Sequence, residues 1–189
     1  MSHTNATHSR LPLPDRADMT AEQVAVFDQA MAFFGAPIGP RIALIDTPEV
    51  ALAWSRLLIA LEASALPKRL WELAILIVAR DWSSQFEWWA HEGKAVSAGI
   101  SRQAIDAIRD GKRPQFAEAD EAATYAYVRE LLQKRSVSDD VHARLRKLIG
   151  TRQLVELTVL VGHYSNVAMT LVAHAVPLPA GVTPPLPRT

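Results

Sequence analysis

The chain has 189 residues, of which 49% are hydrophobic, and 20 Lys and Arg balance 20 Asp and Glu to give a formal net charge of zero. This length and apolar content exclude a disordered chain and suit one domain with a sizeable core. The balanced charge leaves no basic excess for nucleic-acid binding. The absence of cysteine excludes disulfides, thiolate metal sites and thiol nucleophiles.

The predicted elements are all helices, because no stretch alternates polar and apolar residues with a period of two. Thr20 and Gln23 form a capping-box pattern at the start of the first helix, which should end near Phe34. Further helices are expected at 47–63, 68–80, 83–99, 101–111, 118–134, from 138 onward and at 152–174. The sequence therefore predicts an all-α bundle of about eight helices.

The two ends of the chain differ from the body. Residues 1–20 and the proline-rich tail 177–189 predict extended arms that lie over a neighbouring subunit, around a single helical domain at 21–176. The N-terminal arm lacks the continuous apolar core of a secretory signal. Polar residues interrupt the longest apolar run, Leu154–Val176, so we expect a buried helix and no membrane partner.

Glu72 is the most unusual single residue of the sequence. Apolar residues surround it on every side of the helix predicted at 68–80, which is typical of a buried element. A carboxylate there is costly unless it is paired, and desolvation favours its neutral form. Two interpretations stay open: Glu72 anchors the helix through Arg69, Arg80 or a backbone group, or it belongs to a reaction centre.

The stretch SSQFEWWAH, residues 83–91, combines hydroxyl, carboxylate, indole and imidazole groups. Ser84, Glu87 and His91 are spaced so that they share one arc of a helix. Ser84 and Glu87 also match a capping box, which would make both of them structural. Small or apolar residues on both sides of the arc favour an internal cleft over open solvent, where a carboxylate at Glu87 would orient the His91 imidazole.

The last helix carries a polar stripe of its own. Glu156, His163 and His174 are residue types that bind metals, but they are spread over about five helical turns. That spread is too long for one ion, so we expect no metal site there. The stripe instead fits a subunit interface or one wall of a cleft.

With these residues in view, the sequence resembles the carboxymuconolactone decarboxylase family of the all-helical AhpD-like superfamily. The resemblance covers most of residues 40–178. Its specific part is LPKRLWELAILIVARDWSSQFEWWAH, and TPEVALAW, AGISRQAIDAIRDG and LVELTVLVGHYSNVAMTLVAHAVPLP support it. The resemblance implies an all-α, AhpD-like helical bundle that forms oligomers.

The peroxidase branch of this superfamily uses a glutamate, a C-x-x-C pair and a histidine four residues after the second cysteine. Glu72 and His91 stand at the glutamate and histidine positions, whereas Ser84 and Glu87 stand at the two cysteine positions. A serine forms neither the sulfenate nor the disulfide that peroxide reduction requires. We therefore expect no thiol peroxidase activity.

The F-E-W-x-x-H pattern resembles the decarboxylase branch instead. This resemblance implies a cofactor-independent lyase of aromatic catabolism that removes CO2 from a small carboxylated lactone. It also implies a homo-trimer or homo-hexamer that needs no metal or organic cofactor. The lack of cysteine is compatible with a cytoplasmic protein, which is the location we expect.

Within that interpretation, His91 is the general acid/base, and Glu72 and Glu87 orient it and tune its pKa. The substrate carboxylate is held by Arg80. The other substrate-binding candidates are Ser84, Trp88, His163 and Tyr164. Two further interpretations stay open: a lactone isomerase or hydrolase on the same fold, and a non-catalytic helical oligomer that acts as a binding or interaction protein.

Overall fold

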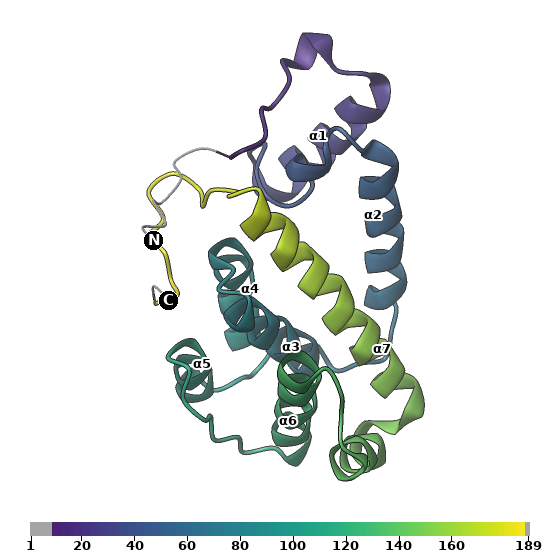
Figure 1. Ribbon diagram of the computed structural model, residues 1–189, viewed down its shortest axis with the longest axis vertical. Coiled ribbons are helices and arrows are strands. Elements are labelled where there is room, and N and C mark those ends of the chain that lie inside the picture. The colour runs from purple at the N-terminus through teal and green to yellow at the C-terminus, as the bar shows by residue number, and fades with distance from the viewer. Residues whose placement is uncertain (1–8, 188–189) are drawn as a thin grey trace. The chain divides into compact units, whose positions relative to one another are not determined.

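The computed structural model describes residues 9–187, and every regular element in that range is a helix. Two short 3-10 helices, η1 and η2, accompany the seven α-helices drawn in Figure 1. The elements are η1 Arg16–Asp18, α1 Ala21–Phe34, η2 Ile42–Leu44, α2 Pro48–Glu62, α3 Lys68–Asp81, α4 Gln85–Ser97, α5 Arg102–Arg109, α6 Ala119–Lys134 and α7 Asp139–Ala173. The predicted all-α class is confirmed, and the helices begin and end close to the predicted residues.

The described residues form two compact units. Residues 9–63 and 169–183 belong to the first unit, and residues 64–168 and 184–187 belong to the second. The single helical domain expected over 21–176 stays a prediction, since the grouping of residues by contact does not test it.

In the first unit, local chemistry determines where α1 begins and ends. The Thr20 hydroxyl accepts a hydrogen bond from the Gln23 backbone N–H, and the Gln23 side chain accepts one from the Thr20 N–H. This confirms the predicted capping box. α1 ends at Gly35, whose φ of 68° is the left-handed conformation that favours glycine at a helix C-terminus.

The described part of the N-terminal arm caps a helix of its own chain. The Arg10 backbone N–H donates to the His174 carbonyl at 2.8 Å, and the Ser9 hydroxyl donates to the same oxygen. The Arg10 guanidinium donates to the Ala173 carbonyl at 3.0 Å. These bonds satisfy carbonyls that the end of α7 leaves unpaired. Residues 1–8 of the predicted arm lie outside the described residues.

α3 is the central helix of the second unit. Its residues from Leu70 to Ala79 are all buried, and α4, α5 and α6 pack around it, as Figure 1 shows. This confirms the prediction that the apolar pattern around Glu72 belongs to a buried helix. A buried helix leaves each of its polar side chains to find a partner inside the protein.

The proline-rich tail also meets its own chain. The Gln85 side-chain amide accepts from the Leu186 N–H at 2.9 Å and donates to the Leu186 carbonyl at 3.1 Å. The Leu186 side chain is buried in the second unit. Leu186 therefore docks at the first turn of α4 of its own chain, and the placement of the tail over a neighbouring subunit stays a prediction.

α7 combines the predicted seventh and eighth helices across a kink at Gly150. It is the one helix in residues 9–187 that is long and apolar enough to cross a membrane on length and composition alone. The kink and the buried side chains of Leu154, Leu157 and Leu160 instead fit a helix of a protein core.

Gly150 supplies a backbone conformation that other residues avoid, with φ 82° and ψ 165°. We expect Gly150→Ala to lower the free energy of unfolding by about 1–3 kcal/mol, although a Cβ there meets no atom within 4 Å. Gly162→Ala is the matched control, since Gly162 is helical and equally uncrowded. It should stabilise the protein by about 0.5–1 kcal/mol. Thermal unfolding of both variants checks this, and equal effects would contradict it.

Candidate functional site

A buried hydrogen bond between α3 and α4 forms the centre of the candidate site. The His91 Nδ1 atom lies 2.7 Å from Glu72 Oε2, and each residue is 8% exposed. Glu72 lies in the first half of the central helix α3, and His91 lies at the middle of α4. The pairing gives the Glu72 carboxyl the partner that burial demands.

The protonation of His91 follows from its surroundings. Burial lowers the pKa of His91, the charge of Lys94 lowers it further, and the hydrogen bond and charge of Glu72 oppose both. The net pKa lies below the ordinary value, so the imidazole is neutral at neutral pH. With its Nδ1–H donated to a carboxylate at Glu72, the ring keeps a lone pair on Nε2, which suits a general acid/base.

Aromatic rings complete the surroundings of His91. Tyr164 of α7 meets the His91 ring edge to face, with 5.2 Å between centroids. The same tyrosine contacts His163 at 5.3 Å and Trp71 at 6.5 Å, both nearly perpendicular. The structure therefore brings Tyr164 to the side of the predicted histidine, and Tyr164 in turn contacts His163 and Trp71. These rings restrict the orientation of the imidazole.

An open groove of about 550 Å³ lies between α3 and α4, within the range of small-molecule sites. Its charged lining comes from Glu72, Lys68 and Lys94. Trp89 and four smaller residues form the rest: Ala90, Gly93, Ser97 and Ala98. The groove thus places the Glu72 carboxyl between helices that each contribute one lysine. Glu72 is the member of the Glu72–His91 pair that lines the groove, and His91 is not among its lining residues.

Ser84 and Glu87 do not form the predicted capping box. Ser84 occupies the N-cap position of α4, but its side chain makes no capping bond. Its hydroxyl and both oxygens of Glu87 are buried and have no hydrogen-bond partner among the described residues. The prediction of a capping box at Ser84 and Glu87 is wrong because both side chains face the protein interior. Their orientation there is set by packing and not by a bond to the helix backbone.

Glu87 also does not orient His91, since no hydrogen bond joins them among the described residues. Burial raises the pKa of Glu87 well above its ordinary value. The carboxyl is 2% exposed and has no cation or donor beside it to favour the charged form. Burial therefore favours the neutral form of the Glu87 carboxyl, one turn away from His91 along α4.

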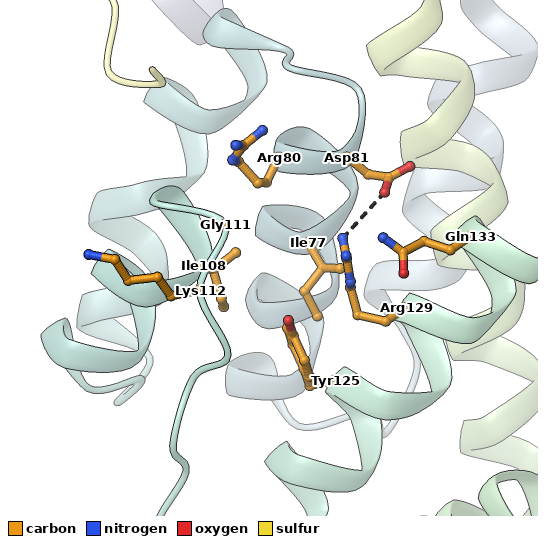
Figure 2. Close-up of a pocket in the computed structure, with 9 residues that line it drawn as sticks. All are labelled: Ile77, Arg80, Asp81, Ile108, Gly111, Lys112, Tyr125, Arg129 and Gln133. Carbon is orange, nitrogen blue, oxygen red and sulfur yellow. Dashed lines mark hydrogen bonds and ion pairs between the residues drawn. The ribbon is translucent and has the colours of Figure 1, made fainter. Parts of the chain in front are cut away.

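Two candidate residues lie elsewhere. Trp88 is fully buried and its indole N–H donates to Glu92 at 3.1 Å, so Trp88 packs in the core while Trp89 lines the groove. Arg80 lines another pocket, drawn in Figure 2, to which neither Glu72 nor His91 contributes. The structure thus does not bring Arg80 to the Glu72–His91 pair.

Lys68 and Lys94 were missed by the sequence analysis, although helical spacing could have found them. Lys68 lies four residues before Glu72, and Lys94 lies three residues after His91, so each shares a helix face with a site residue. Lys68 Nζ also lies 4.6 Å from the centre of the Trp71 ring. A cation stacked on an aromatic ring has a restricted position.

The polar stripe of α7 has other partners. Glu156 forms an ion pair with Arg152 at 2.9 Å, one turn earlier in the helix. Within residues 9–187, no group of three or more His, Asp or Glu side chains is arranged to hold a metal ion.

Comparison with solved structures places this architecture among known folds. A protein of unknown function from Agrobacterium tumefaciens, proposed to be the antioxidant defence protein AhpD, shares 20% identity over 69% of this chain and 91% of its own, with a TM-score of 0.62. An uncharacterised peroxidase-related protein with an alkylhydroperoxidase AhpD core, from Ralstonia eutropha JMP134, reaches a TM-score of 0.75 at 13% identity over 90% and 93% of the two chains. The chain has the AhpD-like fold.

A third structural neighbour is an uncharacterised peroxidase-related protein from Silicibacter sp. TM1040, with a TM-score of 0.71 and 14% identity over 89% of this chain and 90% of its own. No family model and no curated protein matches the sequence. At these identities the likeness extends to the AhpD-like fold, and function has to be argued from the site.

Glu87 gives a testable dependence of stability on pH. A pKa raised in the folded state means that the unfolded chain releases the Glu87 proton above about pH 4.5 while the folded chain holds it. The free energy of unfolding therefore falls as pH rises above that value. Glu87→Gln removes this titrating group, so the Tm of the variant should exceed that of the wild type by several degrees at pH 8. Each 1 kcal/mol of free energy of unfolding corresponds to about 2–4 °C in Tm. The gain should shrink at pH 5. An equal gain at both pH values would refute the assignment of a neutral acid.

The absence of cysteine makes a second prediction for this AhpD-like chain. The purified protein should not reduce organic hydroperoxides with any dithiol reductant, because no thiol is present to cycle. A coupled assay of hydroperoxide consumption checks this. Thiol-dependent turnover that persists after removal of contaminating metal and haem would contradict it.

Proposed function

We propose that the protein is a cofactor-independent acid–base enzyme that removes CO2 from a small carboxylated lactone or a related acid. The observation that carries the proposal is the buried 2.7 Å Glu72–His91 pair, whose carboxyl lines an open groove with a lysine on either helix. The sequence pattern shared with the decarboxylase branch supports the same chemistry.

The groove offers a place for an anionic substrate. Lys68 and Lys94 are exposed cations on α3 and α4, and a substrate carboxylate lying between them is attracted to both. Trp89 provides an apolar surface for an unsaturated ring. These residues take the role that the sequence analysis assigned to Arg80.

The reaction needs one bond to break and one proton to arrive. The bond between the carboxylate carbon and the ring breaks, its electron pair moves into the conjugated lactone, and CO2 leaves. The resulting carbanion is then protonated at carbon by the imidazolium form of His91, which regains its proton from water. Glu72 stabilises that imidazolium and holds the ring in one orientation. The pKa of His91 is lowered by burial. Turnover should fall as pH rises above that pKa, because the fraction of imidazolium falls.

The decisive experiment measures CO2 release from a panel of carboxylated lactones and β-keto acids. His91→Ala should lower turnover by about 10²–10⁴-fold, as is typical of general acid–base groups. His91→Gln should be equally inactive but better folded, because its amide can still bond Glu72. His142→Ala, at an exposed histidine of α7, is the control and should keep full activity.

A second arm tests the groove without touching the acid–base pair. A Cβ at Gly93 meets no atom within 4 Å, so a larger side chain there should fold while filling the groove. Gly93→Leu should abolish turnover, and Gly93→Ala should keep it with equal or higher stability. Isomerised or hydrolysed lactone without CO2 would identify a different reaction at this site. Binding without any turnover would favour the non-catalytic alternative.

The proposal includes assembly and location. We propose a cytoplasmic homo-trimer or homo-hexamer, on the strength of the resemblance and of a net charge of zero, which lowers the electrostatic barrier to self-association.

A further inference from the structure

A separate pocket of about 300 Å³ lies between the C-terminal part of α3, the end of α5 and α6. Its lining is mostly polar and includes Arg80, Lys112, Arg129, Tyr125 and Asp81 (Figure 2). None of these residues lines the Glu72 groove, so the pocket is independent of the proposed function. Its volume suits a small metabolite.

Arg80 is held in place by the protein and still has donors to offer. Its Nε–H donates to the Arg109 carbonyl at 2.8 Å, at the end of α5. Among the described residues its two terminal nitrogens form no hydrogen bond or ion pair. Half-buried and fixed through Nε, the guanidinium presents terminal N–H groups that require acceptors.

Arg129 of α6 is only partly neutralised. Its one partner among the described residues is Asp81, whose carboxylate lies 3.4 Å from Nη1. That distance is long for a charge-assisted hydrogen bond, which is typically 2.7–2.9 Å. The dashed line in Figure 2 marks this pair, and the remaining Arg129 donors are unused.

The other polar groups add donors and positive charge. The Tyr125 hydroxyl points inward between Ile108 and Arg129 in Figure 2 and has no hydrogen-bond partner among the described residues. Lys112 is paired with Asp110 at 3.0 Å. Counting Asp110 with the lining, three cations face two carboxylates, and the donors that still lack partners belong to Arg80, Arg129 and Tyr125.

We propose that this pocket binds a small phosphate monoester. Guanidinium groups from two helices and a phenol hydroxyl line this pocket, and a phosphate group accepts several hydrogen bonds at once. The space beyond one phosphate accommodates a short carbon chain. A carboxylate has fewer oxygens and a lower charge, so it should bind more weakly.

Calorimetric titration at low ionic strength, with inorganic phosphate, glycerol 3-phosphate and succinate as probes, tests this proposal. Glycerol 3-phosphate should bind most tightly, and added chloride should weaken it. Arg80→Gln and Arg129→Gln should each weaken binding by about tenfold or more. Asp81→Asn should strengthen it, because it frees Arg129.

Arg146→Gln, at an exposed arginine of α7, is the matched control and should bind like the wild type. Thermal unfolding without ligand separates loss of binding from loss of folding. Three outcomes would overturn the proposal: no binding by the wild type below about 10 mM, tighter binding of succinate than of either phosphate, or equal binding by the folded arginine variants. Failure of the acid–base function at His91 would leave this result unaffected, since the two sites share no residue.

Discussion

The hydrogen bond between Glu72 and His91 is the constraint on which the rest of the site depends. α3 is buried from Leu70 to Ala79, so the carboxyl of Glu72 within that stretch needs a partner from another element. The partner comes from α4, and the pair therefore fixes how these two helices face each other. Tyr164 then packs against the imidazole from α7. Removing one partner of such a pair leaves a desolvated charge, which is strongly destabilising.

The second unit buries two glutamates in different ways. Glu72 has a histidine partner and an edge on the groove, where lysines lie nearby. Glu87 has neither of these, and its pKa is raised because the carboxyl is buried without a hydrogen-bond partner among the described residues. Glu72 thus accepts a hydrogen bond that orients the His91 imidazole. Burial favours the neutral form of Glu87, which lies one helical turn before His91. Environment alone makes the difference, because both side chains have the same intrinsic chemistry.

An AhpD-like fold without cysteine separates architecture from chemistry. The sequence resemblance puts Ser84 and Glu87 at the thiol positions of the peroxidase branch. In the structure, the Ser84 hydroxyl and both Glu87 carboxyl oxygens are buried without hydrogen-bond partners among the described residues. The Glu72–His91 pair is present as well, and its carboxyl lines an open groove. Under the proposed function, the same helices carry acid–base chemistry without a thiol. A fold restricts where a site lies and leaves its reaction to the residues placed there.

The sequence by itself determined the helices, because their signals are local: the capping box at Thr20, the proline that opens α2 and the apolar surroundings of Glu72. It also singled out Glu72 and His91, since a polar residue in an apolar pattern is visible without coordinates. Tertiary structure decided their pairing, the loss of the Ser84 cap and the separation of Arg80 from the groove. The physical reason is that burial and partners depend on which helix faces meet, and helical periodicity specifies a face without specifying what packs against it.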